Sequence, residues 1–414
     1  MTETRAFEMS SLDVPAESVC FVDVSPTRVL WGINAVDGLA PALPDSTAER
    51  WLIVTGRSLA GDSALISRIE SALPGRSLTF VFDATEEHVP STSIVAGARR
   101  AREIDAQGVI ALGGGTAIDS ARLIALAIGC DLTARLEGVD ASRASDILVE
   151  AAKDSDGDAW PEVVTISTTL SGAEWTPYAG VTDPVRRFKH VTRHSGYRAS
   201  LAVLDAGVAC NTPIRLWLSS GVRALDHAVE TMYSKANHPL VELVAARALQ
   251  LLPDALRGSL AEPQDPEFRA RAQLGSWFSF FSIDTVMIGP SHALSHQIGT
   301  LSGVPHGITS CVLLPTVMGF LRQRSPERHR LIADALGATE TGDSAAAAGE
   351  RAERCIRQLI ADLGLPMRLR DVGVAREDLP EAAERATKET IGMLAAPGVE
   401  LRQADLLSIL ERAY

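Results

Sequence analysis

The first 210 residues alternate short apolar runs with stretches of helical periodicity. The apolar runs lie at 51–55, 78–82, 108–112, 163–167 and 201–204. Helical patterns lie between or after the first three of them, at 62–73, 91–105 and 116–128. Continuous apolar strands that alternate with helices are typical of a parallel sheet buried on both faces. We therefore expect an α/β N-terminal nucleotide-binding domain with a parallel sheet over residues 1–210.

From about residue 211 the pattern changes to helical spacing with few strand-like runs. The expected helices lie at roughly 213–235, 239–257, 266–285, 290–300, 307–323, 326–336, 345–363, 379–395 and 403–413. Prolines such as Pro239 and Pro290 mark the breaks between them. The pattern predicts an all-helical C-terminal domain over residues 211–414. In such an architecture we expect the active site in the cleft between the domains, near the carboxyl ends of the strands.

Composition and charge narrow the class of partner. The 414 residues carry a net charge of −13, which argues against a nucleic-acid-binding protein because phosphate binding needs a surplus of cations. We find neither a signal peptide nor an apolar run of eighteen residues, so no membrane span is expected. The five cysteines contain no CxxC pair, which favours a reducing compartment. We expect a cytoplasmic protein whose partner is a small molecule.

A glycine-rich turn follows the third apolar run. Gly113, Gly114 and Gly115 come directly after 108–112 and before a helical stretch that begins with Thr116. Backbone without side chains lets phosphate oxygens approach the N–H groups, and a helix N-terminus favours an anion. We expect Thr116 to cap the helix, with Asp119 as its capping-box partner. The alternative is a tight turn without a ligand, since the GxGxxG fingerprint is absent.

Two polar stretches follow the later strands. Thr168, Thr169 and Ser171 are hydroxyl residues that come directly after the run at 163–167, where they can line a cofactor groove or form an ordinary loop. The stretch RRFKHVTRH, at 186–194, is basic. It faces substrate or cofactor phosphates, or it is a solvated basic loop.

Histidines gather in the helical half. Arg223 and His227 are four residues apart, so they share one face of a helix, and His292 and His296 repeat that spacing. His306 follows, so three of the nine histidines fall within fifteen residues. Such clustering indicates metal or proton chemistry. The alternative is a set of satisfied helical histidines, because HxxxH without the intervening Glu of a metalloprotease is a common pattern.

In this order and spacing, the motifs resemble the iron-containing alcohol dehydrogenase superfamily, which is related in fold to dehydroquinate synthase. The resemblance runs from TRVLWGINAVDGL at 27–39 to QADLLSILERAY at the C-terminus. It implies an NAD(P)-dependent oxidoreductase that forms a homodimer. The resemblance places the cofactor pyrophosphate on Gly113–Thr116, and the rest of the cofactor along Thr168, Thr169 and Ser171. We group Asp119 with these cofactor-binding residues.

The resemblance also implies a divalent metal held by one Asp and three His, which correspond here to His227, His292 and His306, with His296 near the nicotinamide. The Asp should stand four residues before His227, but this chain has Arg223 there. A guanidinium cannot ligate a metal. A +1 charge about 4 Å from a +2 ion costs about 8 kcal/mol at an effective dielectric constant of about 20. We predict that the catalytic metal is weak or absent, unless a rotation of the helix brings Asp226 into the ligand set.

A second departure indicates a branch of the family. The stretch from Thr168 to Glu174 is one residue shorter than in the usual metal-dependent enzymes. Together with HVP at 88–90, it resembles the maleylacetate reductase branch, in which the Asp ligand is typically missing. Arg223 could bind a substrate carboxylate or stabilise a developing enolate, and His296 or His306 could supply the proton.

The choice of cofactor and reaction leaves alternatives. Gly56 and Arg57 stand where NAD-selective relatives carry an acidic residue, so NADPH is expected to be accepted beside NADH if Arg57 pairs with the 2′-phosphate. Arg57 could equally be a surface residue. We expect a metal-independent reductase that acts on the activated C=C or C=O of a small, carboxylated substrate. The alternatives are a metal-dependent alcohol dehydrogenase and a dehydroquinate synthase-type cyclase or lyase.

Overall fold

The computed structural model describes residues 27–75, 77–154, 160–234, 237–281, 286, 289–388 and 399–414. The chain folds as two compact units. The first unit comprises the described chain up to Thr212 together with a later segment, Gln264–Gln273. The second unit comprises Pro213–Pro263 and Leu274–Tyr414. In the described part of the chain, no helix has the length and apolar character needed to cross a membrane.

Six parallel strands form the sheet of the first unit. Their order across the sheet is β1 (Arg28–Gly32), β8 (Leu201–Asp205), β5 (Glu162–Ser167), β4 (Gly108–Gly113), β2 (Arg50–Thr55) and β3 (Leu78–Phe82). The five predicted strands are confirmed. The edge strand β1 was not predicted, because its sequence RVLWG has no fully buried position and lacks the continuous apolar run of a central strand.

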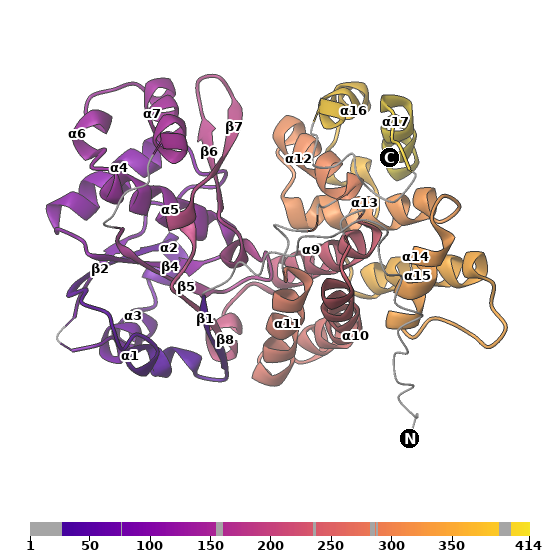
Figure 1. The fold of residues 1–414 in the computed structure, drawn as a ribbon, viewed down its shortest axis with the longest axis horizontal. Helices are drawn as coiled ribbons and strands as arrows, with labels where there is room; N and C mark the ends of the chain where they lie inside the picture. The colour runs from indigo at the N-terminus through magenta and orange to yellow at the C-terminus, as the bar shows by residue number, and fades with distance from the viewer. Residues whose placement is uncertain are drawn as a thin grey trace. The chain divides into compact units, whose positions relative to one another are not determined.

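Helices cover both faces of this sheet (Figure 1). Trp51 and Ile53 of β2 face a core formed with η1 (Ala35–Gly38), α1 (Leu39–Ala42) and α3 (Ser63–Ala72). Leu52 and Val54 face the opposite core, formed with α4 (Ser91–Glu103), α5 (Gly115–Gly129) and α7 (Ala141–Asp154). Burial on both sides explains the unbroken apolar runs and confirms the expected buried parallel sheet. The short elements of this unit are α2 (Arg57–Ala60), α6 (Thr133–Leu136), η2 (Ala173–Trp175), η3 (Ser195–Tyr197) and α8 (Ala206–Ala209).

The strand order reverses direction at β2. The chain passes from β2 to β3 on one side, and then crosses back to β4 on the other side. The loops after β2 and β4 therefore leave the sheet in opposite directions and open a crevice at the carboxyl ends of these strands. The Thr55 hydroxyl donates to the Leu112 carbonyl at 2.7 Å, which joins the two strand ends beside this switch point.

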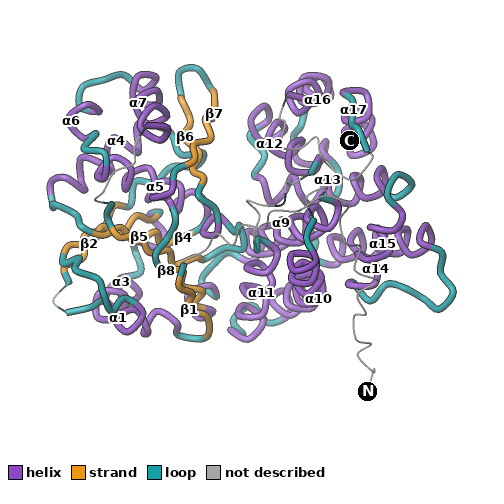
Figure 2. The backbone as a smooth tube through the Cα atoms, in the orientation of Figure 1, coloured by secondary structure: helices purple, strands orange, loops and turns teal. Residues whose placement is uncertain are grey.

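A β-hairpin interrupts the alternation between β5 and β8. Strands β6 (Tyr178–Asp183) and β7 (Phe188–Arg193) pair antiparallel, apart from the main sheet, and pack against α5 and α7 (Figure 2). Asp119 of α5 accepts the backbone N–H of Gly180 at 3.1 Å, and Arg122 donates to the Tyr178 carbonyl at 2.9 Å. These two side chains fasten the hairpin to α5. The basic stretch at 186–194 is thus mostly a strand and not a loop.

The named secondary-structure elements of the second unit are all helices. Its helices are α9 (Ile214–Tyr233), α10 (Pro239–Ala261), α11 (Pro266–Ser279, which begins in the first unit), α12 (Pro290–Ser302), α13 (His306–Leu321), α14 (Pro326–Ala335), α15 (Ala345–Asp362), η4 (Leu369–Val372), η5 (Arg376–Asp378), α16 (Leu379–Lys388) and α17 (Gln403–Ala413). All nine predicted helices are present. Helix α11 ends at Ser279, short of the predicted 285. The predicted extension of α16 to 395 lies outside the described residues.

Candidate active site

The three loops singled out for cofactor binding leave one edge of the sheet. Gly56 follows β2, Gly114 and Gly115 follow β4, and Thr168 follows β5, all at the carboxyl ends of parallel strands. The first two loops flank the switch point, where open α/β sheets bind their ligands. The topology therefore brings together residues that lie more than 100 positions apart in the sequence.

The glycine loop packs closely on the hydroxyl-rich loop, and at Gly114 the packing excludes a side chain. A Cβ on Gly114 would lie 2.9 Å from the Thr169 side chain, and a Cβ on Gly115 would lie 3.6 Å from the Ser171 hydroxyl. Gly113 has φ +147°, a conformation that L side chains rarely adopt. Backbone conformation thus requires a glycine at 113 and space requires one at 114, whereas a Cβ at 115 would meet only ordinary contacts. They leave a backbone surface of the kind that a pyrophosphate could approach.

The N-terminus of α5 carries no side-chain cap. The helix begins at Gly115, its N-cap residue is Gly114, and no described side chain accepts a capping hydrogen bond there. The predicted capping box of Thr116 and Asp119 is wrong, because Asp119 instead accepts the N–H of Gly180. The first N–H groups of α5 therefore lack an intramolecular side-chain acceptor, which is the arrangement that binds anions at helix N-termini.

A buried carboxyl group stands in the hydroxyl-rich stretch. Glu174 is only 3% exposed, and its Oε2 has no hydrogen-bond partner among the described residues. Burial raises its pKa to about 7, although Ser167 and the charge of Arg122 act in the opposite direction. The sequence reasoning used Glu174 only to measure the length of the loop.

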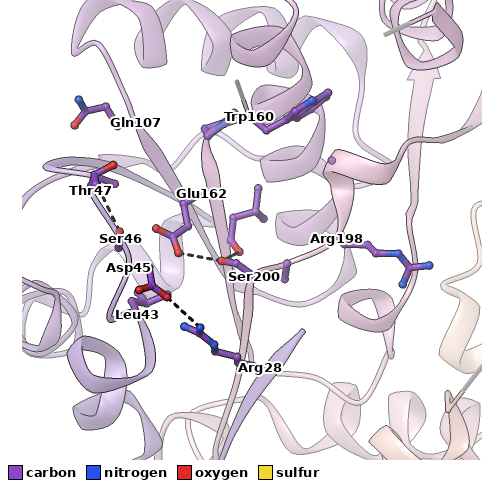
Figure 3. Close-up of a pocket in the computed structure, with 15 residues that line it drawn as sticks. Arg28, Leu43, Asp45, Ser46, Thr47, Gln107, Trp160, Glu162, Arg198 and Ser200 are labelled. Atoms are coloured by element: carbon purple, nitrogen blue, oxygen red, sulfur yellow. Dashed lines mark hydrogen bonds and ion pairs between the residues drawn. The ribbon is translucent and has the colours of Figure 1, made fainter. Parts of the chain in front are cut away.

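A hollow of about 600 Å³ lies at the opposite edge of the sheet (Figure 3). It is lined by residues at the amino ends of the strands, among them Arg28, Trp160, Glu162 and Ser200. Arg28 pairs with Asp45 at 3.3 Å, and the Ser200 hydroxyl donates to Glu162 at 3.2 Å. Because ligands of open α/β sheets bind at the carboxyl ends, this hollow is not the cofactor site.

The four predicted histidines come together in the second unit as two ring pairs. His227 of α9 stacks on His292 of α12, with ring centroids 4.5 Å apart. His296, one turn further along α12, contacts His306 at the start of α13, with centroids 5.3 Å apart. Phe280 packs edge-on against His227 at 3.7 Å. Three helices thus assemble what the sequence presented as separate motifs.

A carboxylate that the sequence reasoning missed fixes this arrangement. Glu230 of α9 accepts the backbone N–H groups of Gly289 at 2.9 Å, Ser291 at 2.6 Å and His292 at 3.3 Å, and also pairs with Nδ1 of His292. It therefore caps α12 and sets the orientation of the His292 ring. The signal in the sequence is its position, three residues after His227 on the buried face of the same helix.

This orientation leaves two imidazole nitrogens buried without partners. Nε2 of His292 and Nδ1 of His227 have no hydrogen-bond partner among the described residues. Burial is the main cause that lowers the pKa of both rings, and the charge of Arg223 lowers both further. The two imidazoles are therefore neutral, and each offers a lone pair or a single N–H group.

Arg223 and Asp226 place opposite charges beside these rings. Arg223 is partly buried, and its Nη1 donates to the Ser310 hydroxyl at 3.3 Å. Asp226 is fully buried, and its Oδ2 accepts the Ser291 hydroxyl at 2.8 Å. Burial raises the pKa of Asp226 to about 6, whereas His292 and Arg223 lower it. The Asp226 carboxyl group thus faces the start of α12. Its Oδ2 lies 3.9 Å from Nδ1 of His292.

The donor set fits a divalent metal poorly. Asp226, Glu230 and His292 are the described residues whose ligand atoms lie within 4.8 Å of one another. However, the Glu230 oxygens already accept three backbone N–H groups, and Asp226 already accepts Ser291. The free nitrogens of His227 and His292 would remain as neutral ligands, with a guanidinium nearby in place of an anionic ligand. Such a set lacks the negative charge that offsets the desolvation of a divalent ion.

Family models match both units of the chain. The model for iron-containing alcohol dehydrogenase matches residues 26–206, and the model for the C-terminal part of the Fe-containing alcohol dehydrogenase family matches residues 217–414. The chain belongs to the iron-containing alcohol dehydrogenase family. It is accordingly an NAD-dependent oxidoreductase, in agreement with the NAD(P)-dependent oxidoreductase that the family resemblance implied.

Relatives in this family act on different substrates. The chain is 27% identical over 367 residues to 1,3-propanediol dehydrogenase of Klebsiella pneumoniae, covering 88% of this chain and 92% of that protein. It is also 27% identical over 364 residues to maleylacetate reductase of Rhizobium sp. (strain MTP-10005), covering 88% and 90%. The crystal structure of a 1,3-propanediol oxidoreductase has the same fold, with a TM-score of 0.83, 24% identity, and coverage of 95% of this chain and 100% of that one.

Proposed function

We propose that the protein uses NADPH or NADH, without a catalytic metal, to reduce an activated C=C or C=O bond of a small carboxylated substrate. Reduction of maleylacetate to 3-oxoadipate is the nearest model. The observation that carries this proposal is Arg223, a partly buried cation where the family would hold a metal. It stands beside two neutral imidazoles, each with one nitrogen that has no hydrogen-bond partner among the described residues.

The residues at the carboxyl edge of the sheet suit the cofactor. Gly113, Gly114, Gly115 and Thr116, at the uncapped start of α5, would hold the pyrophosphate, and Thr168, Thr169 and Ser171 would line the cofactor. Asp119, which lies on α5 one turn after this loop, instead accepts the Gly180 N–H and holds the hairpin on that helix. When bound, the reduced nicotinamide supplies a hydride.

Arg223 takes the role of the electrophile. Addition of a hydride to the β-carbon of an enone pushes the π-electron pair onto the carbonyl oxygen, which becomes an enolate. A guanidinium can stabilise that oxygen, or it can bind the substrate carboxylate through two parallel hydrogen bonds. A proton must then be added to the α-carbon, and His296 or His306 would donate it. His227 and His292, both neutral, would orient the substrate.

The metal-dependent alternative has one observation in its favour, which is the group of Asp226, Glu230 and His292. To bind a metal, Asp226 would have to give up its hydrogen bond from Ser291, and Glu230 its hydrogen bonds from the N-terminus of α12. We therefore rank this alternative second. A cyclase or lyase of the dehydroquinate synthase type is the third candidate. It would show no net consumption of NAD(P)H.

Metal content and substrate choice, measured together, test the proposal. The protein is incubated with excess Fe²⁺ or Zn²⁺, desalted and analysed by elemental mass spectrometry. Parallel assays follow NADPH and NADH oxidation with maleylacetate and with simple aldehydes. We expect less than about a tenth of an equivalent of metal and turnover that survives a chelator, with a preference for the carboxylated substrate. About one equivalent of metal, with activity on aldehydes that a chelator abolishes, would refute the proposal.

A further inference from the structure

We propose that Glu174 is a positioning residue of the cofactor site, and that binding of an anionic cofactor is accompanied by uptake of a proton onto its buried carboxyl group. The carboxyl group is then neutral while it holds the hydroxyl-rich loop against the start of α5. This inference rests on the proposed placement of the cofactor pyrophosphate on Gly113–Thr116. It adds a proton to the binding equilibrium, separate from the proton that the reduction itself consumes.

The first support is the place of Glu174 beside the proposed cofactor loop. Glu174 is the central residue of η2, which packs against α5. A Cβ on Gly115, the first residue of α5, would lie 3.9 Å from the Ala173 Cβ and 3.6 Å from the Ser171 hydroxyl. Glu174 therefore follows directly on a residue that packs beside the start of α5, where the pyrophosphate would place its negative charges.

The second support is that a charge on Glu174 is poorly compensated. The side chain is buried, and Oε2 has no hydrogen-bond partner among the described residues. Burial without such partners favours the neutral form of a carboxyl group. Burial accordingly raises the pKa of Glu174 to about 7, and Ser167 and the charge of Arg122 oppose that rise only in part.

The third support is that Arg122, the cation that acts on Glu174, is engaged elsewhere. Its Nε donates to the Tyr197 carbonyl and its Nη1 donates to the Tyr178 carbonyl, both at 2.9 Å. These bonds hold the guanidinium against η3 and the hairpin, and Nη1 also lies 4.0 Å from Asp119. Arg122 therefore cannot move to Glu174 without giving up its hydrogen bonds to two backbone carbonyls, so it leaves the burial of Glu174 only partly offset.

The other charged groups around α5 do not replace Glu174 as the proton acceptor. Asp119 is also buried, but it accepts a backbone N–H of β6 at 3.1 Å, and the charges of Lys189 and Arg122 favour its ionised form. Tyr197 of η3 is neutral, because burial raises its pKa. The pyrophosphate of a bound cofactor adds negative charge to these surroundings, which disfavours an ionised Glu174 further. Binding and protonation therefore strengthen each other.

Isothermal titration calorimetry with NADH tests the proposal. NADH is the probe because it lacks the 2′-phosphate of NADPH, and a phosphate monoester itself titrates near neutral pH. Titrations in buffers of different ionisation enthalpy give the number of protons taken up. If NADH strengthens proton binding about tenfold, the wild type should take up about half a proton at pH 7.5 and less than about a tenth of a proton at pH 6. Glu174→Gln, an uncharged isostere of the protonated side chain, should take up about half a proton less at pH 7.5.

The pH dependence of the NADH affinity gives a second readout. The same tenfold change makes NADH bind the wild type about eightfold more weakly at pH 9 than at pH 6. Glu174→Gln should keep the wild-type affinity at pH 6 and lose this difference, whereas the exposed Glu137→Gln should follow the wild type at both pH values. A merely structural role of Glu174 would weaken binding by Glu174→Gln at every pH and leave proton uptake unchanged. Other titratable groups of this unit contribute to both proteins, so the difference between them isolates Glu174; these groups include Asp119, His190, His194 and Arg198.

The outcomes separate this inference from the proposed function. Equal proton uptake by the wild type and a folded Glu174→Gln overturns the inference and leaves the metal content and the choice of substrate as they were measured. If Gly114→Ala binds NADH as tightly as the wild type, the placement of the cofactor is wrong and the inference falls with it. If Glu174→Gln does not fold, Glu174→Met is a neutral substitute of similar length. Without a folded variant, the absence of any rise in wild-type proton uptake between pH 6 and pH 7.5 overturns the proposal.

Discussion

The glycine-loop edge of the first unit and the histidine cluster of the second unit carry function in different ways. At the edge of the sheet, backbone geometry forms the candidate site, and close packing of Gly114 on Thr169 leaves little freedom for other residues. In the cluster, side chains from α9, α12 and α13 form the candidate site, and one nitrogen each of His227 and His292 lacks a hydrogen-bond partner among the described residues. Substitution at one position such as 223 can therefore change the chemistry of the cluster while the fold and the cofactor edge persist.

The largest expected effect comes from the residue that distinguishes the cluster. Arg223→Ala should lower kcat/KM for a carboxylated enone by about 10² to 10³, because removing one preorganised electrophilic donor typically costs about 3–4 kcal/mol. The affinity for the cofactor should not change. Steady-state kinetics and cofactor titration measure the two quantities. Arg223→Lys keeps the positive charge but loses the planar guanidinium, so its kcat/KM should lie between those of the wild type and Arg223→Ala. Unchanged turnover in Arg223→Ala would remove Arg223 from the mechanism.

The second effect concerns stability on the cofactor side. Burial raises the pKa of Glu174 from 4.5 to about 7, so the folded state binds a proton more tightly than the unfolded state. The stability that this proton provides is complete below about pH 4.5 and is lost as the pH rises through about 7, an effect of up to about 3 kcal/mol. Glu174→Gln should flatten this fall in denaturant unfolding between pH 5 and 7.5. The exposed Glu137→Gln is the control and should follow the wild type, and a Glu174→Gln curve parallel to both would contradict the prediction.

The third effect tests the close packing of the glycine loop. Gly114→Ala places a Cβ 2.9 Å from Thr169, so the loop must shift and we expect cofactor binding to weaken about tenfold, or about 1.4 kcal/mol. Gly61→Ala is a suitable control, because its Cβ would meet only ordinary contacts at 3.5 Å. Fluorescence titration with NADPH and NADH measures both variants. Equal affinity in the wild type and Gly114→Ala would show that the cofactor does not depend on this loop.

The smallest effect concerns the choice between cofactors. Arg57 is exposed after β2, next to the switch point. If it pairs with the 2′-phosphate, Arg57→Ala should raise KM for NADPH by about fivefold, or about 1 kcal/mol for an exposed ion pair, and leave KM for NADH unchanged. Arg57→Lys should retain most of the preference. An equal change for both cofactors would assign Arg57 to the surface and not to recognition.

The contrast between the regions also explains what the sequence could predict. The central strands and the nine predicted helices from residue 213 onward follow local periodicity, so their positions were found, although α11 ends at Ser279 and not at 285. Strands β1 and β7 were missed because most of their positions are partly or fully exposed. Strand β6 is mostly buried, but its sequence YAGVTD lacks a continuous apolar run, and it takes its structure from pairing with β7. The stretch 188–193 looked like a basic loop, yet the Lys189 side chain packs across Gly180. Burial raises the pKa of Asp119, and the charge of Lys189 opposes that rise.

Within the candidate site, the sequence identified residue types but not their partners. The histidines were found from their spacing, and Arg223 was found because it departs from the family pattern. Glu230 was missed, since its role depends on backbone N–H groups some 60 residues away. Asp119 was misread because its position suggested a local capping box. Its carboxylate instead accepts the N–H of Gly180, which is 61 residues away.

The return of the chain to the first unit has a consequence for dissecting this protein. Gln273, in the segment Gln264–Gln273, donates to the carbonyls at the ends of β5 and β8, and Trp31 donates to the Ala270 carbonyl. A fragment that stops at Thr212 would lose these contacts, although it contains all six strands of the described sheet. The two units therefore cannot be separated by one cut. A fragment that contains the sheet would need residues 264–273 joined to it. Binding of a synthetic 264–273 peptide to the fragment would report directly whether the fragment has folded.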